Sequence, residues 1–181
     1  YERVIDDVTP LQSENPERQQ QLDAILGTAY FRLAYTANRF FDYRRAVQNY
    51  IAIADSQRFT SSSDPQMPER ITDALINAAR ILEYQQDYQR AANFYRRAAQ
   101  VVAEAEARRV AYFRVAEMSF KQENWNLTIR EMRAFIGRYA TDPEAGELVV
   151  TAYWRIAQAR EALRRARDHR RSLEDVVTAF S

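Results

Sequence analysis

Ala29-Tyr30-Phe31-Arg32-Leu33-Ala34 is a stretch that recurs along the chain. Two close copies are Ala111-Tyr112-Phe113-Arg114-Val115-Ala116 and Ala152-Tyr153-Trp154-Arg155-Ile156-Ala157, and a looser one is Ala74-Leu75-Ile76-Asn77-Ala78-Ala79. The four starts are 45, 37 and 41 residues apart, a period typical of helical repeats. On a helix, each copy forms one apolar stripe with alanine at two points of close backbone approach. The pattern therefore predicts an array of packed helices.

The composition supports an all-helical chain and excludes several functions. Of the 181 residues, 46% are hydrophobic, and there are only three glycines and five prolines, which favours helices with an ample core. The net charge of +1 gives no general attraction to nucleic acid or membrane. No cysteine is present, which excludes disulfides, thiolate catalysis and cysteine-ligated zinc. No apolar run reaches the length of a membrane span.

We predict one repeat domain over residues 1–181, built from helix pairs. The expected pairs cover 16–56, 68–103, 105–140 and 143–181, with an exposed loop over 57–67, which is rich in turn-forming polar residues. Asn15-Pro16-Glu17 and Thr141-Asp142-Pro143-Glu144 have the residue types that start helices. Residues 1–10 are expected to form the end of a preceding repeat helix, because their apolar residues have helical spacing and Pro10 follows. The chain is thus expected to be a fragment of a longer array.

These residues resemble the tetratricopeptide repeat (TPR). In that pattern, the first helix has a large residue followed by an aliphatic-small pair, and the second has an aromatic residue three positions before alanine. The small position is occupied by Ala34, Ala79, Ala116 and Ala157, and the second element by Tyr43…Ala46, Tyr88…Ala91 and Trp125…Thr128. Tyr50, Tyr95 and Met132 occupy the next position of the pattern. The resemblance covers residues 16–181 and implies a right-handed solenoid of about four helix-turn-helix repeats.

A second resemblance concerns the junction Phe135-Ile136-Gly137-Arg138-Tyr139-Ala140-Thr141-Asp142-Pro143. It is similar to junctions in bacterial envelope repeat proteins, such as the Tol-Pal-associated coordinators, outer-membrane assembly lipoproteins and gliding-motility repeat proteins. This resemblance implies the bacterial periplasm or cell envelope as the location, with the cytoplasm as the alternative.

Resemblance to the TPR also implies which residues line a concave wall of first helices. The candidate partner-binding residues are Phe31, Tyr35, Ile76, Arg80, Tyr84, Phe113, Phe120 and Trp154. A row of large apolar residues in a concavity suits capture of a peptide or partner helix. The alternative, that these side chains pack against neighbouring helices or a terminal segment, stays open. The basic residues with which chaperone-tail adaptors clamp a terminal carboxylate are not present in this pattern.

No set of residues indicates catalysis, and we expect no cofactor or metal. His169 is the single histidine and has no nucleophile or second ligand in a recognisable pattern. The basic run from Arg160 to Arg171 is interleaved with Glu161 and Asp168, as in a solvated helix face with paired charges.

The leading hypothesis is a non-enzymatic scaffold that binds a protein or peptide partner, without nucleic acid and without a membrane span, within a bacterial envelope assembly. The alternative is a self-assembling module that stacks through its end repeats, one end near Tyr1 and the other near the apolar Val176, Val177 and Phe180.

Overall fold

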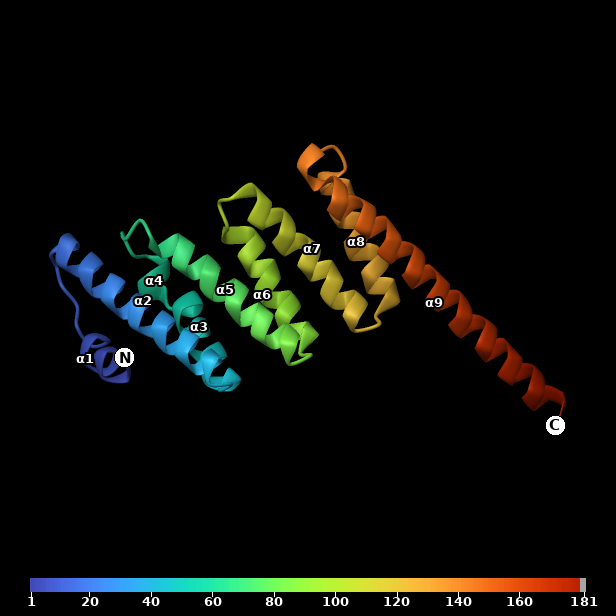
Figure 1. Cartoon of the computed structure of the whole chain (residues 1–181), viewed down its shortest axis with the longest axis horizontal. Helices are drawn as coiled ribbons and strands as arrows, with labels where there is room; N and C mark the ends of the chain where they lie inside the picture. The colour runs from blue at the N-terminus through green and yellow to red at the C-terminus, as the bar shows by residue number, and fades with distance from the viewer. Residues whose placement is uncertain (180–181) are drawn as a thin grey trace. The chain divides into compact units, whose positions relative to one another are not determined.

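The computed structural model describes residues 1–179, with side chains as far as Glu174, and this part of the chain is all-helical with no strand. The helices are α1 (Glu2–Val8), α2 (Pro16–Arg39), α3 (Tyr43–Asp55), α4 (Gln57–Thr60), α5 (Met67–Tyr84), α6 (Tyr88–Val101), α7 (Ala105–Lys121), α8 (Trp125–Tyr139) and α9 (Gly146–Ala179), with a 3-10 turn η1 (Pro143–Ala145) before α9. The order is shown in Figure 1.

The chain forms two compact units. Unit 1 is Tyr1–Ala111 and unit 2 is Tyr112–Ser181, so the boundary falls within α7. In unit 1, α2 packs on α3 and α5, α3 packs on α5, and α5 pairs with α6. Figure 1 shows α2 and α5 running alongside each other. In unit 2, α8 packs on α9.

Three helix pairs are joined by the same turn. Phe41, Gln86 and Glu123 have positive φ angles of 62°, 63° and 56°, which ends the preceding helix in the left-handed conformation. The next residue then caps the second helix: the side chains of Asp42, Asp87 and Asn124 accept backbone N–H bonds of 3.1, 3.2 and 3.3 Å, respectively. These caps explain why the second helices begin at Tyr43, Tyr88 and Trp125.

The recurring small residues lie where the helices approach most closely. Ala34 and Ala79 are 0% exposed and Ala116 is 1% exposed, and Ala46, Ala91 and Thr128 on the second helices are 0% exposed. Ala157, at the same position in α9, is exposed. A larger side chain at the buried sites would force the helices apart.

The segment 57–67 differs from the exposed loop predicted from its polar sequence. It contains α4, and Phe59 and Met67 are 2% and 1% exposed. The Phe59 ring packs edge-on against Tyr30 of α2, with ring centroids 6.3 Å apart. Phe59 and Met67 are separated by polar residues and form no helical or strand periodicity. Their burial could therefore not be predicted from the sequence pattern.

Residues 146–179 form one continuous helix, whereas a helix pair was predicted for 143–181. Between Arg160 and Arg171 there is neither glycine nor proline, and ion pairs support the helix. Arg164 contacts Glu161 and Asp168 at 2.9 and 3.2 Å, and Arg165 contacts Glu161 at 2.8 Å. The hydrogen bonds from Arg164 and then Arg165 lower the pKa of Glu161 to about 2. Val176, Val177 and Phe180, predicted to form an apolar end, lie beyond the last described side chain.

Candidate functional site

Two open hollows follow one another along the seam between α2 and α5. The first, of about 380 Å³, is lined by Thr28, Phe31, Arg32, Tyr35, Arg70 and Asp73. The second, of about 460 Å³, is lined by Asn38, Arg39, Phe41, Tyr43, Arg80, Ile81 and Tyr84. We call these two hollows together the α2–α5 groove. All of it lies within unit 1.

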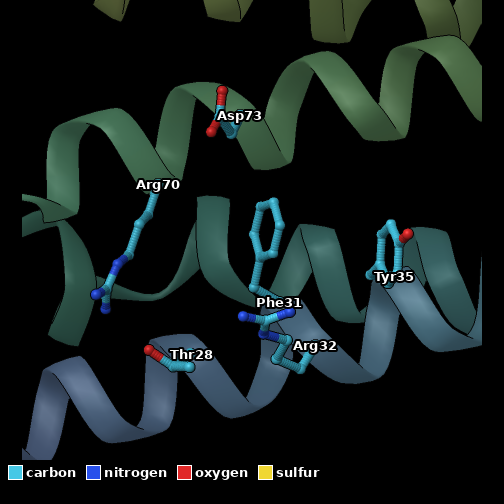
Figure 2. A pocket seen from close by; sticks show the side chains of 6 residues that line it. All are labelled: Thr28, Phe31, Arg32, Tyr35, Arg70 and Asp73. Carbon is cyan, nitrogen blue, oxygen red and sulfur yellow. The ribbon is translucent and has the colours of Figure 1, made fainter.

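Helical spacing places the lining residues on facing sides of the two helices. On α2, Phe31, Tyr35 and Asn38 are spaced i, i+4 and i+7, so they form one stripe. On α5, Asp73, Arg80 and Tyr84 are spaced i, i+7 and i+11 and form another. Figure 2 shows Phe31 directed from α2 toward α5, with Tyr35 further along α2 and Asp73 on the opposite helix.

Aromatic contacts hold the surface of the groove in place. Phe31 packs edge-on against the buried Tyr50 of α3, with ring centroids 5.4 Å apart. Tyr43 and Tyr84 pack with centroids 5.5 Å apart in the second hollow. Tyr35 and Tyr84 nevertheless keep 46% and 73% of their surface exposed, which leaves aromatic area available to a partner.

Burial also shifts two pKa values beside the first hollow. The pKa of Asp73 is raised, chiefly by loss of hydration and then by the charge of Glu69, against the opposing effect of Arg80. Desolvation, with the charges of Asp73 and Tyr35, raises the pKa of Tyr50 to about 12. Added negative charge close to Asp73 is therefore unfavourable.

The arginines of the groove differ in how they are held. Arg70 Nη1 donates to the carbonyl of Ala24 at 3.0 Å and Nη2 to Gln66 at 3.0 Å. Arg39 donates to the Tyr35 hydroxyl at 3.3 Å. Arg70 Nη1 also lies 3.7 Å from the carboxylate of Asp64, and the charge of Arg80 acts on Asp73. Arg32 has no ion-pair partner among the described residues, so its charge is available to an anionic group on a partner.

The groove contains half of the residues predicted from the sequence. Phe31, Tyr35, Arg80 and Tyr84 line it, and the half-buried Ile76 of α5 lines neither hollow. The sequence analysis missed Arg32, Arg70 and Asp73, which line the first hollow, and Phe41 and Tyr43, which line the second. Phe41 and Tyr43 come after the end of α2. The helical spacing of α2 therefore does not predict where their side chains lie.

The predicted residues of unit 2 lie in different surroundings. Phe113 is 7% exposed and packs against Phe135, with ring centroids 5.4 Å apart. Phe120 is half-buried under the guanidinium of Arg155, 4.2 Å from the ring centroid. Arg155 in turn pairs with the buried Glu117 at 2.8 Å. Only Trp154, 63% exposed on α9, presents a large free surface.

Other kinds of site find little support in the described part of the chain. No cluster of three or more His, Asp or Glu side chains there could hold a metal ion. None of the described helices combines the length and the apolar character needed to cross a bilayer. The chain matches no protein-family model and no curated protein.

Proposed function

We propose that this chain is a non-catalytic scaffold with TPR-like repeats, which binds a peptide or partner helix in the α2–α5 groove. The single observation that carries the proposal is the alignment of two hollows whose walls combine exposed aromatic rings with arginine side chains. Aromatic residues and arginine provide most of the binding energy in protein interfaces.

The repeat pattern supports the TPR-like part of the proposal. Three successive helix pairs share the positive-φ turn and the Asp or Asn cap, and small residues are buried at matching positions in each. The location in a bacterial envelope assembly is a proposal that rests on the sequence resemblance of residues 135–143.

The charges of the groove define the kind of segment we expect it to bind. Four arginines, Arg32, Arg39, Arg70 and Arg80, line it with one carboxylate, Asp73. A segment with an apolar side chain over Phe31 and a carboxylate near Arg80 would match both the rings and the charges.

A displayed random-peptide library tests this proposal. We expect the full chain to enrich peptides that join acidic and apolar residues, and the double variant Tyr35→Ala, Tyr84→Ala to bind them about tenfold or more weakly. The matched control is Tyr153→Ala, which removes a tyrosine that is 59% exposed on α9. Circular dichroism checks that each variant is folded. Absence of enrichment, or equal binding by the double variant, would contradict the proposal.

A further inference from the structure

The outer side of α9 is an apolar face with nothing packed on it among the described residues. Val150, Tyr153 and Trp154 are 69%, 59% and 63% exposed, and Ala157 is exposed as well. Their spacing places them on one side of the helix. The residues that pack toward α8, including Ala152 and Ile156, lie on the opposite side. We call Val150, Tyr153, Trp154 and Ala157 the α9 face.

The same positions are covered elsewhere in the chain. Ala34 in α2 and Ala79 in α5 are 0% exposed, and α3 and α6 pack on these helices. Ala157 has the same place in the repeated stretch but is open to solvent. A small residue flanked by large apolar ones permits close helix approach, so the α9 face has the composition of a covered surface.

A second apolar surface lies at the start of unit 1. The cleft between α1 and α2 has a volume of about 350 Å³ and is lined by Tyr1, Val4, Ala24, Ile25, Thr28 and Ala29. The Thr28 hydroxyl donates to the carbonyl of Ala24 at 2.7 Å, so its hydrogen-bonding capacity is used within α2. Tyr1 and Ile25 are 60% and 49% exposed. Burying such a lining costs little polar desolvation.

The packing of unit 1 indicates what fits in this cleft. There, α2 rests on both α3 and α5, which also pack on each other. Helix α1 likewise packs on α2, but no helix of the described residues packs on both of them. By analogy with the packing of α2 on α3 and α5, a helix of the α2 type with an apolar face would fit against α1 and α2. Helix α9 contains a copy of the repeated stretch found in α2 and has an exposed apolar face, so it is a helix of this kind.

We propose that the α9 face of one copy packs into the α1–α2 cleft of a second copy. The contact would bury Trp154 and Tyr153 against Tyr1, Val4 and Ile25 of the second copy. Because the two surfaces differ, each copy retains one free surface of each kind, and association continues head to tail into a chain or ring. This proposal does not rest on peptide binding in the α2–α5 groove.

Sedimentation velocity of the full chain at increasing concentration tests the contact. We expect the average mass to rise beyond that of a dimer, and Trp154→Arg and Ile25→Arg each to weaken association about tenfold or more. Val101→Arg is the matched control, because Val101 is also 49% exposed but lies on α6, outside both surfaces. Circular dichroism establishes that the variants are folded.

A mixing experiment separates this contact from other modes of association. The Ile25→Arg variant keeps its α9 face and the Trp154→Arg variant keeps its cleft, so an equimolar mixture should form dimers and stop there. Association of Ile25→Arg alone as strong as that of the unmodified chain would show that two α9 faces pair with each other, and would overturn the proposal. A chain that stays monomeric at every concentration would overturn it as well.

Discussion

Asp23 connects three segments of unit 1 through one buried carboxylate. It is 3% exposed and accepts hydrogen bonds from Arg58 at 2.7 Å, Gln19 at 2.7 Å and Ser62 at 2.9 Å. Arg58 also donates to the carbonyl of Thr9 at 3.0 Å. The end of α1, the body of α2 and the segment around α4 are thereby held together through Asp23 and Arg58, although Nη2 of Arg58 is buried without a hydrogen-bond partner.

Replacing Asp23 should therefore be far more damaging than replacing one of its neutral partners. We expect Asp23→Ala to lower the free energy of unfolding by about 3 to 5 kcal/mol, because it leaves the Arg58 side chain, which is only 18% exposed, without its counter-ion. Ser62→Ala, which removes a single donor, should cost about 1 kcal/mol. Denaturant unfolding of both variants measures the difference, and equal losses would contradict this account.

Tyr50 gives the stability of unit 1 a dependence on alkaline pH. Its pKa is raised from 10.0 to about 12 in the folded chain, so the unfolded chain loses the phenolic proton first. The stabilisation is complete below about pH 10 and is lost as the pH rises toward 12, by roughly 2 to 3 kcal/mol at most. Denaturant unfolding across this range should show a shallower decline for Tyr50→Phe. Identical slopes for the two proteins would exclude Tyr50 as the cause.

At the scale of elements, the turns within the helix pairs place ordinary residues in a conformation that glycine adopts more easily. Gln86 has a φ of 63° between α5 and α6. A residue with a Cβ atom in the left-handed region costs about 1 to 2 kcal/mol. Phe41 and Glu123 have the same left-handed conformation, so this conformational cost is a regular feature of the turn.

Substitution of Gln86 by glycine should remove part of this strain. We expect Gln86→Gly to raise the free energy of unfolding by roughly 0.5 to 1 kcal/mol after the entropic cost of glycine. Gln48→Gly makes the same chemical change on the exposed side of α3 and should lower stability by about 1 kcal/mol. Thermal unfolding of the pair gives the sign. Destabilisation by both would show that the turn is not strained.

The sequence predicted those elements whose ends carry local signals. The helices Pro16–Arg39 and Ala105–Lys121 begin where the predicted pairs 16–56 and 105–140 begin, and the second helices start at the aromatic residues identified in the repeat pattern. The burial of Phe59 could not be predicted because it depends on Tyr30, distant in sequence. In the candidate site, Tyr35 and Tyr84 are at positions that the TPR resemblance implies for a concave wall. Phe113 is at such a position too, but it is buried because Phe135 packs on it, a contact between helices that the pattern within one helix does not reveal.

At the scale of the whole molecule, each unit has a buried core of its own. In unit 2 the core includes Phe113, Met132, Phe135 and Ile156. In unit 1 fully buried side chains such as Leu75 and Leu82 lie on α5, among the helices that pack around it. Parts of a protein that have separate cores can open with different free energies.

Local unfolding should therefore follow the division into Tyr1–Ala111 and Tyr112–Ser181. We expect Phe135→Ala, which removes a ring that is 3% exposed, to cost about 3 to 5 kcal/mol and to speed amide hydrogen exchange in α8 and the first half of α9. Exchange in α2, α3 and α5 should change little, because these helices belong to unit 1, whereas Phe135 belongs to the core of unit 2. Asp23→Ala should give the reverse pattern: amide exchange becomes faster in α2 and stays unchanged in α8.

Hydrogen exchange read by mass spectrometry resolves the two regions in one experiment. A uniform acceleration across both units by either variant would show that the chain unfolds as one cooperative body, and the core of each unit would then stabilise the other as strongly as itself.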